Sequence, residues 1–256
     1  MIRTELNYGV ARLTLARPEK KNAFNGDMLQ AIDATIAAWG ADPAVRVIVV
    51  QAEGETFCAG ADLAWMAQYA DADRATNVQS ARELGGVFHR LAKAPKPVVG
   101  RIQGAARGGG VGLVAAVDIA IASDRASFAL TEVRLGLLPG VISPFVVERV
   151  GPSRARQLFM TGETVSASDA ERWGLVHACV SHTELDARVD AVVGLLVQGG
   201  PEALLACKQL VDVVAFQPPH AVFEQTAGLI ADRRVSAEAQ EGMVAFLTKR
   251  KPSWIP

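Results

Sequence analysis

The chain has 256 residues, a formal net charge of −1 and a mean hydropathy of +0.20, and half of its residues are hydrophobic. These values predict a soluble globular protein with a large core. The balanced charge gives no electrostatic footprint for nucleic acid or for an anionic membrane surface, and no apolar run reaches the roughly 18 residues that cross a bilayer. We therefore expect neither nucleic acid nor a membrane as a partner.

The first hundred residues alternate between strand and helix signals. Residues 9–15 alternate apolar and polar side chains and predict a half-buried strand, and Asn25 predicts the N-cap of the following helix. The polar, alanine-rich segment 71–81 predicts a mobile stretch or a lid. Further strands are expected over residues 45–50, 98–102, 118–122 and 127–130.

Beyond Gly136 the pattern is helical, and its last periodic segment predicts one helix over residues 221–246. Strand–helix alternation followed by helices is typical of an α/β protein in which the sheet comes first. A seam of glycine and proline near residues 199–201 divides the chain into a predicted sheet-bearing region, residues 1–198, and a helical region, residues 199–256.

Cysteine usage bears on the compartment and on metals. Cys58, Cys179 and Cys207 are odd in number and form no CxxC pair, which favours neither a disulfide framework nor a zinc site. Glu5 lies where a secretory signal would carry its apolar segment. The sequence thus predicts a cytoplasmic protein that binds no metal.

The most informative segment is 104–113, in which five of ten residues are glycine and which leads into an apolar run. Glycine clusters occur where the backbone turns sharply or a ligand approaches closely, and a helix that starts there exposes N–H groups with partial positive charge. A second such turn spans residues 59–63. If the N–H groups of Ala61 and Gly109 converge, they form an oxyanion hole; otherwise these are ordinary tight turns.

Two carboxylates, Glu132 and Asp62, each have two possible roles. Glu132 lies in an apolar stretch, where burial would raise its pKa and let it exchange protons near neutral pH. The alternative is a surface glutamate that pairs with Arg134. Asp62 either caps the helix that follows it or bridges two parts of the structure.

Five segments, taken in order, carry a resemblance to a known family. They are Lys20–Asn25, Phe57–Leu63, Pro97–Asp118, Phe128–Gly140 and Glu241–Arg250. Their order and spacing resemble the crotonase (enoyl-CoA hydratase/isomerase) superfamily over essentially the whole chain. The resemblance implies a spiral of ββα units followed by a helical trimerisation region, assembled as a homotrimer or homohexamer. It also implies an acyl-CoA thioester substrate, with CoA as part of that substrate and no separate cofactor.

The resemblance also assigns roles to residues. Ala61 and Gly109 fall on the two oxyanion donors, and Glu132 falls on a catalytic carboxylate. Positions that hold CoA in the family are Lys21, Ala23, Ala59, Asp62, Leu63, Phe246 and Lys249. In some members the last two reach the CoA of a neighbouring subunit, so the helical region would cover it.

One departure and one finer similarity complete the comparison. Many hydratases of this family carry a second glutamate where this chain has Gly112, so a two-carboxylate mechanism cannot be transferred. Residues 61–66, 141–147 and 234–236 are similar to bacterial 3-methylglutaconyl-CoA hydratases of leucine breakdown, and hydratases of acyclic terpene degradation look similar too. Those substrates have a distal carboxylate, for which Arg107 and Arg134 are candidate partners.

The sequence therefore favours an enoyl-CoA hydratase that adds water across the 2,3-double bond of a branched, carboxylated enoyl-CoA. One alternative is an enoyl-CoA isomerase, in which a single glutamate moves a proton between C2 and C4. The other is a non-catalytic acyl-CoA-binding member of the same fold.

Overall fold

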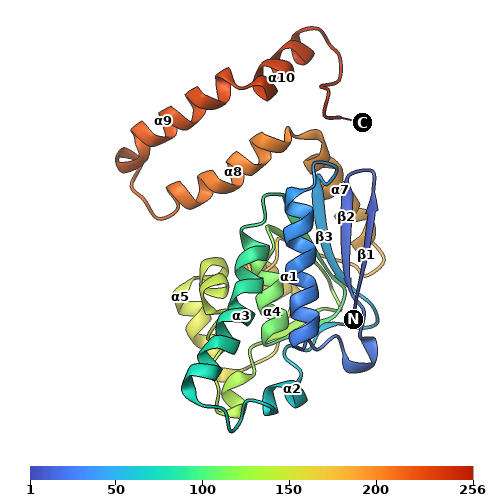
Figure 1. Cartoon of the computed structure of the whole chain (residues 1–256), viewed down its shortest axis with the longest axis vertical. Helices are drawn as coiled ribbons and strands as arrows, with labels where there is room; N and C mark the ends of the chain where they lie inside the picture. Colours follow the sequence, from blue (N-terminus) through green and yellow to red (C-terminus); the bar gives the residue numbers. More distant parts are fainter. Residues whose placement is uncertain (256) are drawn as a thin grey trace.

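Two β-sheets form the framework of the protein, which is described by a computed structural model over residues 1–255 (Figure 1). The large sheet has the order β1-β2-β3-β5-β7-β10, and the small sheet has the order β4-β6-β8-β9. The strands of the large sheet are β1 (Ile2–Asn7), β2 (Val10–Leu15), β3 (Val47–Ala52), β5 (Val98–Ile102), β7 (Ile119–Ser123) and β10 (Ala178–Val180). Those of the small sheet are β4 (Thr56–Cys58), β6 (Ala105–Arg107), β8 (Ser127–Ala129) and β9 (Val165–Ser166).

The chain winds between the two sheets in a repeating pattern. In the pairs β3–β4, β5–β6 and β7–β8, the first strand joins the large sheet, the second joins the small sheet, and a helical segment follows. The strands that these pairs contribute to each sheet run parallel. This arrangement confirms the predicted α/β fold with a spiral of ββα units. The helices of this part are α1 (Gly26–Ala41), α2 (Leu63–Ala67), α3 (Arg74–Ala92), α4 (Gly109–Ala116), α5 (Ser143–Thr161), α6 (Ala167–Arg172) and α7 (Leu185–Gln198).

The side chains of β3 show how the large sheet is buried on both faces. Successive residues of a strand point to opposite faces, and in β3 both sets are apolar. Ile48 and Val50 pack in the main core with residues of α1, α3 and α4, whereas Val47 and Val49 pack with α7. The large sheet therefore lies between α7 on one side and the remaining helices on the other.

The structure differs from the sequence predictions in two helical segments, each of which begins at a capping side chain. The predicted mobile segment 71–81 is helical from Arg74 onward, and Asp73 caps this helix by accepting a hydrogen bond from the Thr76 N–H (2.8 Å). The predicted helix 221–246 is two helices, α9 (Pro219–Val235) and α10 (Ala237–Leu247). Ser236 separates them and caps α10 through its hydroxyl.

The C-terminal helices α8 (Pro201–Val214), α9 and α10 project from the rest of the chain (Figure 1). Gly199 and Gly200 lie between α7 and α8, where the boundary between regions 1–198 and 199–256 is predicted. An ion pair between Lys208 Nζ and Asp118 Oδ2 (2.9 Å) joins α8 to the sheet region.

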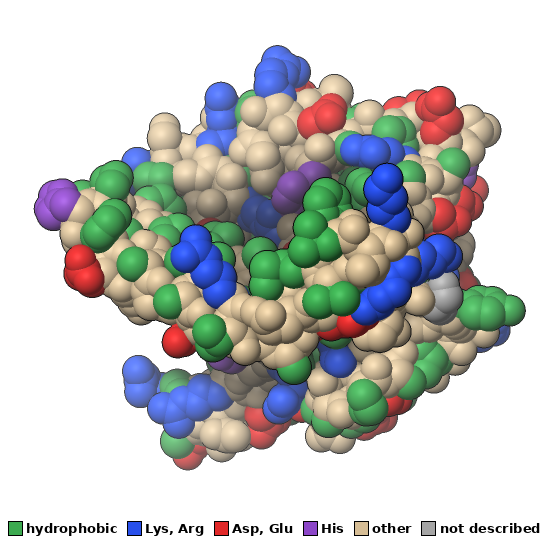
Figure 2. Space-filling view, turned by 90° about the horizontal axis from the view of Figure 1, so that it is seen from above, with side chains coloured by type: hydrophobic (Ala, Val, Ile, Leu, Met, Phe, Trp, Pro, Cys, Tyr) green, Lys and Arg blue, Asp and Glu red, His purple; other side chains and the backbone are tan. Residues whose placement is uncertain are grey.

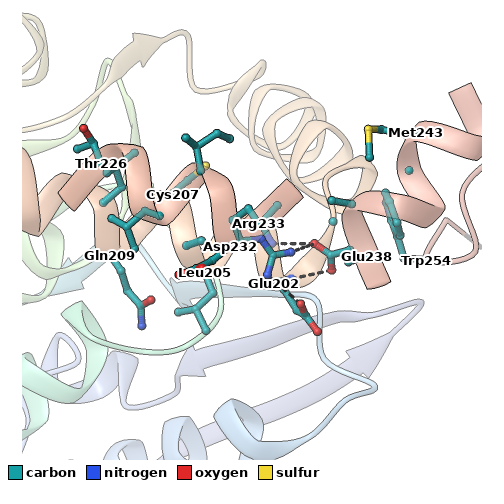
Figure 3. Close-up of a pocket in the computed structure, with 18 of the residues that line it drawn as sticks. Glu202, Leu205, Cys207, Gln209, Thr226, Asp232, Arg233, Glu238, Met243 and Trp254 are labelled. Carbon is teal, nitrogen blue, oxygen red and sulfur yellow. Dashed lines mark hydrogen bonds and ion pairs between the residues drawn. The ribbon is translucent and has the colours of Figure 1, made fainter. Parts of the chain in front are cut away.

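A hollow of about 1190 Å³ with mainly apolar walls lies between these three helices. At one end of it, the Glu238 carboxylate accepts hydrogen bonds from the first N–H groups of α8, at Glu202 and Ala203, and pairs with Arg233 (Figure 3). Hydrophobic side chains gather on the face seen in Figure 2, and Phe246 on α10 is 84% exposed. The helical region thus leaves much apolar surface uncovered in one chain.

No single helix within residues 1–255 has the length and apolar composition to cross a membrane, although α7 and α8, which meet at 106°, pass that test as a bent pair.

Candidate active site

The glycine cluster forms a sharp turn between a strand and a helix, as predicted. β6 ends at Arg107, Gly108 takes a left-handed φ of 48°, and α4 begins at Gly109. The Gly108 N–H donates to the Ala129 carbonyl of the neighbouring strand (2.9 Å). Gly109 is the first residue of the helix, where an N–H group has no intrahelical acceptor. The turn therefore presents a free donor at the positive end of α4.

The second turn presents another free donor. Phe24 pairs with the residues on both sides of Ala61: its N–H donates to the Gly60 carbonyl (2.9 Å), and its carbonyl accepts from the Asp62 N–H (2.8 Å). In this parallel pairing Ala61 directs its own N–H to the opposite side. Within residues 1–255, neither this N–H nor that of Gly109 has a hydrogen-bond partner.

The two turns are in contact with each other. A Cβ atom at Gly60, whose φ is 90°, would lie 3.4 Å from the Gly109 nitrogen. Ala61 and Gly109 both line one cavity of about 490 Å³, and so does Glu132. The structure therefore brings together the three residues that the sequence predicts as oxyanion donors and catalytic carboxylate.

Apolar side chains make most of this cavity. They come from the loop before α1, from the turn after β4, from α2 and α3, and from the segment between β8 and α5. The larger ones are Phe24, Leu63, Met66, Leu84, Leu135, Leu137, Leu138, Val141 and Ile142. Such a wall suits an acyl chain and excludes water from the groups at its polar end.

Glu132 begins a short 3-10 helix, η2 (Glu132–Leu135), which follows β8 and ends at Gly136 in a left-handed conformation. Its carboxylate lies against the glycine turn, since Oε1 would be 3.1 Å from a Cβ atom at Gly108. Its Oε2 is buried and has no hydrogen-bond partner within residues 1–255. Burial raises the pKa of Glu132 above its ordinary value, so this carboxyl group can both take and return a proton.

The two candidate arginines lie in different places. Arg107 donates to the Ser127 carbonyl (2.7 Å) and hydroxyl (2.9 Å) on β8, and it does not line the cavity. Arg134 lines the cavity, and within residues 1–255 no carboxylate lies within 4.0 Å of it. Of the two candidates, the structure brings only Arg134 to the site.

The position of Gly112 explains how the site is filled where the second glutamate is missing. A Cβ atom at Gly112 would overlap the Cγ2 of Ile142 and would lie 3.2 Å from Cε1 of Phe88. Two apolar side chains, one from α3 and one just before α5, therefore occupy this space. No local pattern predicts this contact, because Ile142 is thirty residues away from Gly112 along the chain.

The residues predicted to hold CoA fall into two groups. Lys21 and Ala59 are joined by a main-chain hydrogen bond from the Ala59 N–H to the Lys21 carbonyl (2.9 Å), and Ala23 is in the same loop as Lys21. Leu63 is exposed on α2 and lines the cavity. Ala59 and Leu63 thus line the cavity on either side of Ala61, and Lys21 and Ala23 lie in the loop bonded to Ala59.

Asp62 has both of the roles that the sequence left open. It caps α2 by accepting a hydrogen bond from the Ala64 N–H (3.0 Å), and it pairs with Arg17 (3.3 Å) from the loop after β2. The cap and the Arg17 guanidinium lower the pKa of Asp62. Asp62 thus fixes the start of α2 next to Ala61.

Phe246 and Lys249 do not line the cavity of their own chain. They lie on and just after α10, at the opposite end of the molecule from α2, which marks the cavity (Figure 1). In this arrangement neither residue therefore lies at the cavity of its own chain.

The hydrogen bonds of two buried residues beneath the turns were not predicted from the sequence. Asn22 and Cys58 are both fully buried, and they hydrogen-bond to each other's segments. The sequence could have indicated a turn at Asn22, because asparagine tolerates the left-handed conformation that it has here (φ 54°).

No group of three His, Cys, Asp or Glu side chains that could hold a metal ion is found within residues 1–255.

Comparison with known proteins agrees with this geometry. A sequence profile of the family described as enoyl-CoA hydratase/isomerase matches residues 5–255. The chain belongs to this family, the crotonase superfamily of the sequence analysis.

Individual relatives span nearly the full chain. An enoyl-CoA hydratase from Shewanella pealeana has a crystal structure that superposes with a TM-score of 0.95 at 37% identity, covering 99% of this chain and 95% of the other. The crotonyl-CoA hydratase of Syntrophomonas wolfei is 33% identical, covering 96% of this chain and 94% of that protein. The trans-2-decenoyl-[acyl-carrier-protein] isomerase of Streptococcus mutans is 32% identical, covering 97% and 95%.

Proposed function

We propose that this protein is an enoyl-CoA hydratase that adds water across the 2,3-double bond of a branched, carboxylated enoyl-CoA of the 3-methylglutaconyl type, as in leucine or acyclic terpene breakdown. The observation that carries the proposal is the carboxylate of Glu132, whose Oε2 is buried, beside the N–H groups of Ala61 and Gly109, which have no hydrogen-bond partner within residues 1–255. The apolar wall would receive the branched acyl group, and Arg134 would pair with its distal carboxylate.

The proposed reaction uses one carboxyl group for both proton transfers. The thioester oxygen accepts hydrogen bonds from Ala61 and Gly109, which stabilise the negative charge that develops as water adds at C3. Glu132 takes the proton of that water and then returns a proton to C2, so the carboxylate is regenerated and the thioester stays intact. Losing one oxyanion donor would cost about 2.7–4 kcal/mol of transition-state stabilisation.

A second candidate is supported by the filled space at Gly112. The heavy atoms nearest to a Cβ at Gly112 belong to the apolar side chains of Ile142 and Phe88. Apolar groups at this position favour an isomerase that only moves a proton between C2 and C4. The relative named as an isomerase supports this alternative. Supplying a 2-enoyl-CoA and a 3-enoyl-CoA separately in ¹⁸O-water distinguishes the two reactions, because only hydration incorporates the label. Binding of both esters without turnover would instead indicate a non-catalytic protein.

The Arg134→Ala variant tests the substrate carboxylate. We expect the KM for 3-methylglutaconyl-CoA to rise by about ten- to a hundredfold, since a hydrogen bond to a charged group contributes about 1.5–3 kcal/mol. The KM for crotonyl-CoA, which has no carboxylate, should stay the same. Arg107→Ala is the matched control, because its guanidinium is bound to Ser127. An unchanged KM for 3-methylglutaconyl-CoA in Arg134→Ala would remove Arg134 from this role.

We further infer that the active protein is a cytoplasmic homotrimer or homohexamer in which the helical region of one subunit covers the CoA of another. The exposed apolar faces of α8–α10 support such an assembly, as does the distance of α10 from its own cavity (Figure 1). Phe246 would pack on the adenine end of CoA, and Lys249 would pair with a phosphate.

The Lys249→Ala variant tests this cover. Its KM for an enoyl-CoA should rise about two- to fivefold, the range for an exposed ion pair of up to 1 kcal/mol. The KM for the same acyl group on pantetheine, which lacks the nucleotide, should not change. Lys251→Ala serves as the control, since Lys251 is also exposed on the tail. A rise with the pantetheine ester as well would contradict a contact with the nucleotide.

A further inference from the structure

Between Ala59 and Asp62, hydrogen bonds hold every amide of the turn except that of Ala61. The Ala59 N–H donates to the Lys21 carbonyl (2.9 Å), and the Asp62 N–H donates to the Phe24 carbonyl (2.8 Å). The Gly60 N–H has a different kind of acceptor, the sulfur of Cys58 (3.4 Å). Three amides are thus fixed, and the direction of the fourth follows from them.

The Cys58 thiol joins this turn to the neighbouring loop. Its Sγ accepts from the Gly60 N–H and donates to the Asn22 carbonyl (3.2 Å). Donation to the Asn22 carbonyl requires the S–H, and burial raises the pKa of Cys58 to about 12, which keeps the thiol protonated. The thiol therefore acts as donor and acceptor at once.

Asn22 in turn is anchored by its side chain. Its Nδ2 donates to the carbonyls of Glu53 (2.8 Å) and Thr56 (2.8 Å), and its Oδ1 accepts from the Arg17 N–H (2.9 Å). Asn22 is fully buried and left-handed, so its carbonyl has one fixed direction. The chain of bonds from Asn22 through Cys58 to Gly60 is therefore rigid at its far end.

Cys58 also contacts the second donor's helix. A Cβ atom at Gly110 would overlap the Cys58 carbonyl oxygen, and it would lie 3.0 Å from the Cys58 Cβ. Gly110 follows Gly109 directly, so the main chain of Cys58 sets how closely α4 can approach the turn at Ala61. One residue thus adjoins both amides.

We propose that Cys58, held by Asn22, is a positioning residue that sets the direction of the Ala61 N–H and its separation from the Gly109 N–H. This inference rests on the proposed oxyanion function of those two amides. Cys58 does not touch the substrate; it acts through Gly60 and through the approach of α4. A substitution that keeps a donor and acceptor at this position should keep the geometry, and one that removes them should loosen it.

The test compares Cys58→Ser with Cys58→Ala, because a serine hydroxyl can replace both hydrogen bonds and alanine can replace neither. Turnover is measured with 3-methylglutaconyl-CoA and crotonyl-CoA. We expect Cys58→Ala to lower kcat about tenfold, less than the ~10²- to 10³-fold of a deleted oxyanion donor, with little change in KM. Cys58→Ser should restore most of the kcat. Cys179→Ala, at a half-buried cysteine on β10, should behave like the wild type.

A spectroscopic measurement separates positioning from simple loss of packing. Difference infrared spectra of bound crotonyl-CoA with a ¹³C-labelled thioester carbonyl report how strongly the two amides polarise that carbonyl. The carbonyl stretching frequency of the wild-type complex should be lower than that of the free ester. In Cys58→Ala it should be higher than in the wild type but still below that of the free ester. In Cys58→Ser it should be close to the wild-type value.

The two possible failures are distinguishable. An unshifted band in the wild-type complex would refute the oxyanion hole itself. A shifted band in the wild type that is the same in Cys58→Ala, or a loss that Cys58→Ser does not restore, would refute the positioning role of Cys58.

Discussion

Replacing Glu132 by glutamine should lower kcat by about 10²- to 10⁴-fold, the range for losing a general acid–base group, and should leave KM nearly unchanged. Glutamine has the same shape but cannot take a proton from water or return one to carbon. Substrate binding should persist, because the amides of Ala61 and Gly109 and the apolar wall are untouched. Glu148→Gln, at an exposed glutamate on α5, is the control. An unchanged kcat in Glu132→Gln would exclude Glu132 from the reaction.

The raised pKa of Glu132 adds a pH dependence with a defined sign. Because the ionised form is the base, kcat/KM of the wild type should fall on the acid side, with an apparent pKa above that of an ordinary glutamate. The folded protein also binds this proton more tightly than the unfolded chain does. The stability contributed by the protonated group is therefore present below the ordinary pKa and is lost as the pH rises through the raised one. The glutamine of Glu132→Gln stays neutral at every pH and does not lose this stability as the pH rises. The Tm of the variant at pH 7 should therefore exceed that of the wild type.

The second large effect is expected at Gly112. The variant Gly112→Glu should not gain a second catalytic carboxylate. It should lower the free energy of unfolding by about 3 kcal/mol or more, because overpacking and an unpaired buried charge act together. Ile142 and Phe88 already occupy the space that the new side chain would need. Thermal unfolding should show a Tm lower by about 6–12 °C.

Two further variants make this prediction specific. Gly86→Glu is the matched control, since Gly86 is exposed on α3 and a Cβ atom there would contact nothing within 4 Å. The double variant Gly112→Glu/Ile142→Gly removes the overlapping side chain and should recover part of the lost stability. The contrary result would be a Gly112→Glu protein that is as stable as the wild type and more active. That result would show that Ile142 and Phe88 move aside at little cost, and it would contradict the close packing described above.

The parts of the site that the sequence predicted are those encoded by local turns. Gly108 and Gly60 mark two backbone reversals, and each reversal places a donor one residue later, at Gly109 and Ala61. Glu132 was predictable for a similar reason, because it lies in an apolar stretch directly after a strand. In each case the residues that determine the conformation are neighbours along the chain.

The parts that the sequence did not predict depend on contacts between distant segments. Ile142 fills the space at Gly112, and the guanidinium of Arg107 donates a hydrogen bond to Ser127. Neither contact is predicted by the residues next to it in the sequence. The division of the last long helix at Ser236 is different, because a serine N-cap was visible in the sequence. The apolar periodicity continues across Ser236, and on that basis one uninterrupted helix was predicted. In the structure, Ser236 caps α10 and thereby begins a new helix.

The winding of the chain between its two sheets has a consequence for how such a site can diversify. The three groups of the site come from three successive coils: Ala61 after β4, Gly109 after β6 and Glu132 after β8. Parallel strands end at the same edge of a sheet, so each coil delivers one chemical group to a shared point. Evolution could therefore exchange the acid on the third coil, or lengthen its loop for another acyl chain, and the two amides supplied by the earlier coils would remain in register.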